Sequence, residues 1–262
     1  MRLRFTPVMA VLGFLFLYGP IASLVIYSFN ESKLVTVWGG WSLKWYGELF
    51  ANQQIMDAAW LSLRIAAISA SVAVVLGTMM AMVLVRFRRV RGKSLMTGMV
   101  TAPLVMPDVI IGLSLLLLFV AMQGLIGWPG GRGFTTILIA HITFGMAFVA
   151  VVVQSRLSDM DDAVEEAALD LGASPARVFF DITLPMITPA LIAGWLLAFT
   201  LSLDDLVIAS FVSGPGASTL PMVIFSKVRL GVSPDINALA SLIVLVVSIG
   251  IITAALLMRK KP

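Results

Sequence analysis

The sequence predicts an all-α membrane protein whose chain crosses the bilayer six times. Of its 262 residues, 60% are hydrophobic and only 12% are charged, whereas a soluble domain is roughly 25% charged. The apolar residues also lie in long runs, and not in the short alternating segments of a transmembrane barrel. Because an isolated strand cannot satisfy its backbone in lipid, each run is expected to be a helix.

Six runs are long enough to cross the hydrocarbon core, which takes about 20 apolar residues. The first is longer than the roughly 7–15 apolar residues of a cleavable signal peptide, so we expect it to be retained as a helix. Residues 1–262 are expected to form a single transmembrane domain. The predicted spans are 7–29, 58–85, 97–122, 134–156, 187–208 and 237–258.

Basic residues predict the orientation, because cytoplasmic loops carry an excess of Lys and Arg. One set of span ends has twelve basic residues and the opposite set has five, so both termini are expected in the cytoplasm. Arg64, inside the second span, is expected to extend toward the interface, with a place in a polar pathway as the alternative. The twelve are Arg2, Arg4, Arg86, Arg88, Arg89, Arg91, Lys93, Arg156, Arg177, Arg259, Lys260 and Lys261.

The first outer segment, Asn30–Asp57, is rich in aromatic residues. An aromatic belt at the membrane interface would account for most of these rings. The alternative is that a ring near a pore mouth binds an organic cation by cation–π attraction. Trp45, in the short helical pattern SLKWYGELF, is the first candidate for that role.

Carboxylates inside predicted spans indicate a polar pathway. Asp108 follows Pro103 and Pro107, and a rise of about 1.5 Å per residue places it roughly 20 Å from the inner end of its span. A carboxylate at that depth should face a cavity or a partner, although it could instead cap the helix after the proline break.

The fifth span ends in LSLDDLVIASF and contributes Ser202, Asp204 and Asp205. Among basic residues of the spans, only Arg64 is an obvious partner for these two aspartates. Negative groups in the outer half of a span suit a cationic substrate. The following segment, Leu220–Leu230, is too short to cross the membrane, and Ser233-Pro234-Asp235 is typical of a helix N-terminus.

The segment Asp159–Pro185, here called the acidic segment, holds seven of the chain's fourteen carboxylates. It predicts two short helices: one from Met160 to Leu171 ended by Gly172, and one that starts with Ser174 as N-cap and Pro175 at its first position. We expect Leu184-Pro185 to break the second helix before the next span. The predicted docking face consists of Ala167, Ala168, Val178 and Phe179.

The acidic segment also resembles the EAA signature of ABC importer permeases, EAA-x3-G-x9-I-x-L-P, and matches it without a gap. The resemblance implies the type I importer permease fold, in which this segment is the coupling helix that docks on a separate ATP-binding subunit. The matching residues are Glu166, Ala167, Ala168, Gly172, Ile182, Leu184 and Pro185.

Within that family the chain resembles the polyamine branch, the PotC/PotI type, and most closely its putrescine members. Segments 16–30, 102–119, 197–222 and 228–240 carry this likeness, together with SKLVTVWGGWSLKWYGELF and IGWPGGRG. It implies ATP-driven import of polyamines across the bacterial inner membrane, and roles in uptake for Trp45, Glu166, Ser202, Asp204 and Asp205. Asp108 is added to these from its position alone.

The resemblance further implies the partners: a second homologous permease in a heterodimeric pore, a dimer of ATP-binding subunits, and a periplasmic polyamine-binding protein. No cofactor is expected on this chain, because ATP and Mg²⁺ would be bound by the partner ATPase. The alternative is a secondary transporter or channel for organic cations, which would also use membrane carboxylates and broken helices. An intramembrane enzyme is disfavoured, since HExxH, paired histidines and GxSxG are absent.

Overall fold

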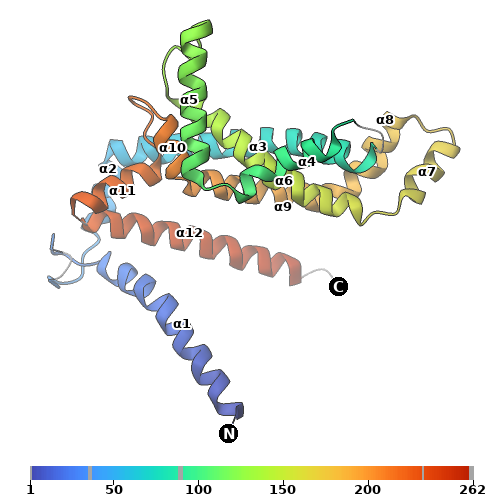
Figure 1. The fold of residues 1–262 in the computed structure, drawn as a ribbon. Coiled ribbons are helices and arrows are strands. Elements are labelled where there is room, and N and C mark those ends of the chain that lie inside the picture. The colour runs from blue at the N-terminus through green and yellow to red at the C-terminus, as the bar shows by residue number, and fades with distance from the viewer. Residues whose placement is uncertain (1, 35–36, 88–90, 232, 260–262) are drawn as a thin grey trace. The chain divides into compact units, whose positions relative to one another are not determined.

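The computed structural model describes residues 2–34, 37–87, 91–231 and 233–259, and helices dominate this part of the chain (Figure 1). Within these ranges the only β pairing is an isolated bridge between Asn30 and Trp41. The all-α prediction is therefore confirmed. Arg88, Arg89, Lys260 and Lys261, which contribute to the predicted orientation, lie outside the described residues.

The chain forms two compact units, Met1–Asp57 with Val223–Pro262, and Ala58–Met222. In the first unit, α12 (Pro234–Arg259) contacts both α1 (Arg2–Tyr27) and α2 (Lys44–Ala51). The expectation of a single domain stays a prediction.

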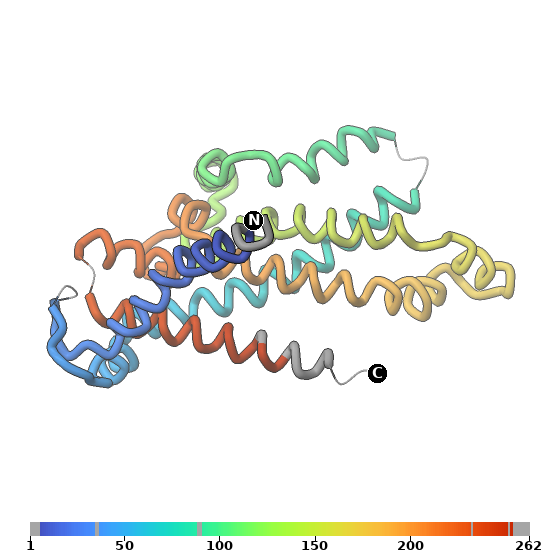
Figure 2. Tube along the Cα trace, turned by 90° about the horizontal axis from the view of Figure 1, so that it is seen from below, coloured from blue at the N-terminus to red at the C-terminus, as the bar shows by residue number. Residues whose placement is uncertain are grey.

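In the second unit, α3 (Gln53–Arg86), α6 (Phe134–Ser158) and α9 (Leu184–Asp204) lie side by side in both views (Figures 1 and 2). Their shared core is built mainly from Ala and Val. A Cβ at Gly77 of α3 would lie 2.8 Å from Val149 Cγ1 of α6, so a side chain there would collide. Small residues thus bring these backbones close together, as is usual for helices packed in lipid.

Two predicted spans are interrupted. The third is divided into α4 (Lys93–Val105) and α5 (Asp108–Ile126), which point in different directions (Figures 1 and 2). The fifth ends at Asp204, and a short α10 (Val207–Val212) follows. The prediction that 97–122 and 187–208 are continuous helices is therefore wrong. At the first break the reason is Pro107, which has no N–H and disfavours helix at the preceding residue.

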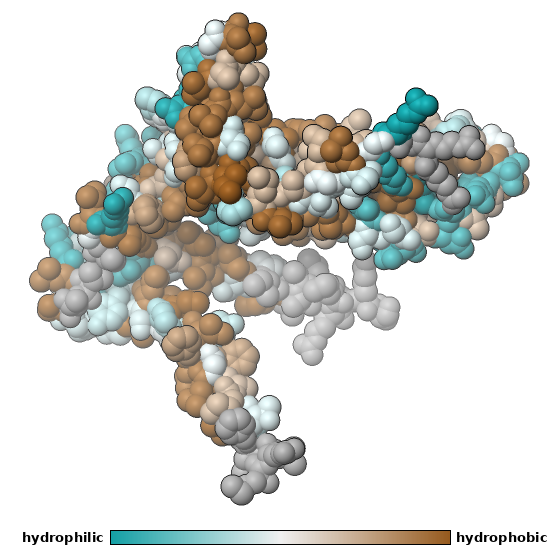
Figure 3. Space-filling view, viewed as in Figure 1, coloured by the Kyte–Doolittle hydropathy of each residue, from teal (hydrophilic) through white to brown (hydrophobic). Residues whose placement is uncertain are grey.

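Most of the predicted crossings are matched by long apolar helices among the described residues. Five are long enough to span, and the described apolar part of α12, Pro234–Gly250, is shorter. Exposed hydrophobic side chains cover α5, whereas hydrophilic ones gather around α7 (Asp162–Asp170) and α8 (Pro175–Val178) (Figure 3). The predicted short helix Leu220–Leu230 is present as α11.

The packing of α5 on α10 gives a first prediction. A Cβ at Gly112 would lie 2.7 Å from Phe211 Cδ2, so Gly112→Val should overpack this contact and lower stability by about 1–3 kcal/mol. Thermal unfolding of the detergent-solubilised protein measures the loss. Gly124→Val on the same helix is the control, because a Cβ there meets nothing within 4 Å. Equal melting temperatures for the two variants would contradict this packing.

Candidate functional site

The two helix breaks lie close together and bring three carboxylates into one region of the second unit. Helix α5 packs on α10, so the start of α5 lies near the junction between α9 and α10. The carboxylate of Asp204 interacts electrostatically with those of Asp205 and Asp108. We call Asp108, Asp204 and Asp205 the acidic cluster. Sequence analysis singled out all three, and the fold brings them together.

Asp205 is held by three N–H donors. Its Oδ2 accepts from His141 Nε2 at 3.1 Å and from the Ala209 amide at 2.7 Å, and its Oδ1 accepts from the Ile208 amide at 3.2 Å. The side chain is only 9% exposed. Asp205 therefore caps the start of α10. Its carboxylate accepts hydrogen bonds from amides that the break in the helix would otherwise leave unpaired.

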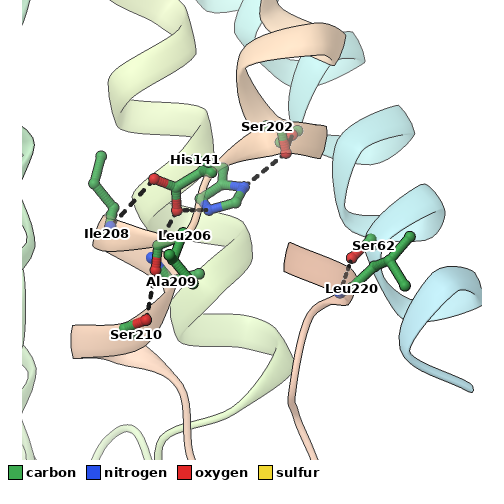
Figure 4. A network of polar contacts seen from close by, with 10 residues as sticks. Ser62, His141, Ser202, Leu206, Ile208, Ala209, Ser210 and Leu220 are labelled. Atoms are coloured by element: carbon green, nitrogen blue, oxygen red, sulfur yellow. Dashed lines mark hydrogen bonds and ion pairs between the residues drawn. The ribbon is translucent and has the colours of Figure 1, made fainter. Parts of the chain in front are cut away.

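The second residue of this network is His141, whose side chain is 2% exposed. Figure 4 shows its ring between Ser202 on one side and the carboxylate beside Ile208 and Ala209 on the other. Its Nδ1 lies 2.6 Å from Ser202 Oγ, which in turn lies 3.1 Å from Ser69 Oγ on α3. The network thus joins α3, α6, α9 and α10.

Sequence reasoning missed His141, because it considered histidine only as a member of a pair. The available signal was its place within an apolar span, where an ionisable residue is expensive and needs a partner. The structure also shows that Arg64 does not pair with the aspartates as considered: its guanidinium lies 5.5 Å from the centre of the Phe134 ring.

Asp204 and Asp108 differ from Asp205 in that both are exposed. Among the described residues, neither carboxylate accepts a hydrogen bond from another side chain. Asp108 occupies the first turn of α5 without capping it, so the capping role considered for it is not found. The acidic cluster therefore combines one carboxylate bound by the protein with two that are accessible.

Trp45 lies in the first unit and is 4% exposed. Its Nε1 donates to the Asn30 carbonyl at 2.6 Å, and Lys44 Nζ lies 5.3 Å from its ring centre. The ring thus makes a cation–π contact with a residue of its own chain and holds the loop that follows α1.

The acidic segment forms the predicted pair of short helices. Asp161 caps α7 by accepting from the Ala163 amide, and Gly172 ends it with φ of 88°. Ser174 Oγ accepts from the Arg177 amide at 3.4 Å, and Pro175 begins α8. The predicted cap, stop and first-turn proline are therefore confirmed, although α7 runs from Asp162 to Asp170 and is shorter than expected.

Two expectations for this segment are wrong. Leu184-Pro185 does not break the helix, because a π-helical turn, η1 (Phe179–Thr183), leads directly into α9. Pro185 falls in the first turn of α9, where its missing N–H is tolerated. Val178 is 5% exposed, so it is not on an exposed docking face. Ala167 of the predicted face is exposed, and the exposed large apolar residues here are Val164, Leu169, Leu171 and Phe180, beside exposed Glu166.

Arg86 attaches α7 to the end of α3, which sequence analysis did not foresee. Its Nη2 donates to Glu165 Oε1 at 3.1 Å, and its Nη1 pairs with Asp162. Thr183 Oγ1 donates to the same Glu165 oxygen at 2.7 Å. These groups line part of a pocket of about 390 Å³, whose wall also includes Glu166 and Phe179.

The part of the chain that the structure describes contains no candidate metal site. There, no group of three or more His, Asp or Glu side chains is arranged to hold a metal ion. The acidic cluster gathers negative charge at the two helix breaks.

Broken helices and ionisable residues within apolar helices are typical of transport proteins. Residues 73–260 match the family described as the binding-protein-dependent transport system inner membrane component, and the chain belongs to that family. This is a family of inner-membrane permeases, and it supports the importer reading over the secondary transporter or channel.

Named relatives lie in the polyamine branch. The chain is 66% identical to the putrescine transport system permease protein PotI of Escherichia coli K12, over 90% of this chain and 84% of that one. It is 42% identical to the spermidine/putrescine permease protein PotC of the same strain, over 94% and 90% of the two chains.

Solved structures agree on the fold. A chain of a bacterial ABC transporter involved in the import of alginate has a TM-score of 0.71 at 16% identity, covering 98% of this chain and 96% of that one. The MetNI methionine ABC transporter gives 0.62 at 16% identity, covering 77% and 92%. The expected ABC importer permease fold is confirmed.

The Arg86 contact gives a second prediction. Arg86→Gln should loosen α7, because Glu165 loses a charged donor, and amide exchange in residues 162–170 should rise roughly tenfold, about 1.4 kcal/mol of local stability. Hydrogen-exchange mass spectrometry measures this. Arg177→Gln, at an exposed position on α8, is the control. Unchanged exchange in the Arg86 variant would mean that α7 is held by other contacts.

Proposed function

We propose that this chain is one permease half of an ATP-driven importer that carries a diamine, most specifically putrescine, into the cytoplasm. The proposal depends mainly on one observation: the two helix breaks meet, and the accessible carboxylates of Asp108 and Asp204 interact electrostatically there. The identity of 66% to a putrescine permease supports the choice of substrate.

The chemistry of a diamine fits this arrangement. Amines with pKa values of about 10 are protonated at neutral pH, so putrescine carries two positive charges. Opposite charges attract strongly where the dielectric is low, so two accessible carboxylates can replace much of the lost hydration. A pathway must also release its substrate, which favours few contacts over a fully enclosing site.

The other predicted residues of the pathway take supporting places in this proposal. Ser202 and Asp205 line the same break and are bonded to His141. Trp45, in the first unit, stays a predicted residue of the pathway, and its ring makes a cation–π contact with Lys44.

The helix pair of the acidic segment is the proposed docking point for an ATP-binding subunit. Glu166 is exposed on α7, next to the Glu165 that Arg86 and Thr183 hold. In this proposal a dimer of ATP-binding subunits binds ATP and Mg²⁺, a second homologous permease completes the pore, and a periplasmic polyamine-binding protein delivers substrate. A related ABC transporter structure is described in complex with a substrate-bound periplasmic protein.

The coupling role of Glu166 is tested in the reconstituted complex. Glu166→Ala should reduce substrate-stimulated ATP hydrolysis at least about tenfold while membrane insertion is unchanged, because the contact that transmits closure is lost. Asp170→Ala, an exposed carboxylate on the same helix, is the control. Normal stimulation in the Glu166 variant would show that coupling lies elsewhere.

The substrate role of Asp204 is tested by uptake of labelled putrescine. Asp204→Asn keeps the side-chain shape but removes the charge, and should raise KM by about tenfold or more, equivalent to ~1.4 kcal/mol. Asp57→Asn, exposed and outside the acidic cluster, should leave KM unchanged. Competition with spermidine and longer diamines then ranks the substrates. Loss of complex assembly in the Asp204 variant would instead make this residue structural.

A further inference from the structure

We propose that His141 is a positioning residue for substrate binding. It holds Ser202 and Asp205 on the protein side of the acidic cluster and thereby fixes the direction of Asp204. This inference rests on the proposed function, because it assigns the accessible carboxylates of Asp204 and Asp108 to the ammonium groups of the substrate.

Two protonation states of the His141 ring fit its contacts, and in both of them Nε2 donates a hydrogen bond to Asp205. With neutral His141 carrying its proton on Nε2, Ser69 donates to Ser202, Ser202 donates to Nδ1, and Nε2 donates to Asp205. With protonated His141 the hydroxyls reverse, and Ser69 donates to the Ala66 carbonyl at 3.2 Å. A proton on Nδ1 alone would turn the Nε2 lone pair toward a carboxylate, which is unfavourable.

The carboxylate of Asp205 is therefore used mainly for hydrogen bonds within the protein. Both of its oxygens already accept N–H groups, from His141, Ile208 and Ala209. Three of the roughly four lone-pair sites of this carboxylate are thus occupied, which leaves about one for a substrate ammonium group. Asp204 is the neighbouring residue in the chain and is exposed, and among the described residues no other side chain donates to its carboxylate.

The hold on Asp205 also orients Asp204. The two residues are adjacent at the end of α9, where the helix has no following turn to fix its last side chains. His141 reaches this point from the buried face of α6 and is itself anchored through Ser202 to α3. Removing the ring would leave Asp205 bonded to the Ile208 and Ala209 amides without the imidazole that ties it to α6, so that Asp204 would be less firmly fixed relative to Asp108.

The test compares three substitutions in the reconstituted importer. The amide nitrogen of Gln can take the place of Nε2 and keep the bond to Asp205, whereas Asn reaches only Ser202 and Leu keeps neither. His141→Leu and His141→Asn should raise KM for putrescine about tenfold with kcat within roughly twofold, and His141→Gln should stay within about threefold of the wild type in KM. Thr143→Val, at an exposed position on α6, is the matched control.

Two double-mutant cycles separate positioning from stability. The double variant His141→Leu with Asp204→Asn should have the same KM as Asp204→Asn alone, because the ring acts through Asp204. In melting temperature, the losses from His141→Leu and Asp205→Asn should not add, whereas those from His141→Leu and Asp204→Asn should add.

The proposal is overturned if His141→Gln is as impaired as His141→Leu, or if His141→Leu lowers the melting temperature and leaves KM unchanged. It is also overturned if the KM effects of His141→Leu and Asp204→Asn are additive. A wild-type complex that imports no diamine would overturn the proposed function alone. The melting-temperature cycle would still decide whether His141 and Asp205 act as one unit.

Discussion

The arrangement of the second unit depends on keeping a carboxylate stable where water is scarce. Removing an ion from water costs several kcal/mol unless hydrogen bonds and charge compensate for it. Asp205 meets this requirement with one imidazole N–H and two backbone amides of α10. The same three bonds satisfy part of the break between α9 and α10. A feature that would otherwise be destabilising thus becomes the point at which four helices are joined.

Helix α3 connects the helix pair of the acidic segment to the polar network around His141. Ser62 accepts a hydrogen bond from the Leu220 amide at 2.8 Å, Ser69 bonds to Ser202, and Arg86 holds Glu165. Seventeen residues separate Ser69 from Arg86, which corresponds to roughly 25 Å along a helix. One continuous helix therefore touches the helix pair of the acidic segment at its end and the polar network within the membrane-spanning part.

Within the described residues of the second unit, three departures from regular α-helix lie inside or between the predicted spans. The break at Met106-Pro107, the junction at Asp205 and the π-helical turn Phe179–Thr183 each interrupt an otherwise regular helix. The first two lie beside the acidic cluster, and the third carries Thr183, which bonds to Glu165. Departures from helical geometry, often found at functional sites, here coincide with the residues assigned to substrate and coupling.

The sequence by itself determined the class of protein, because long apolar runs can be stable only as helices in lipid. It also determined the helix pair, whose Ser174, Pro175 and Gly172 are local signals that need no distant partner. Only the tertiary structure decided which carboxylates are accessible. Asp204 and Asp205 are adjacent and chemically identical, and they differ because His141, 64 residues from Asp205 in the chain, reaches one of them. Such a pairing depends on how α6 packs against α9, which no local pattern encodes.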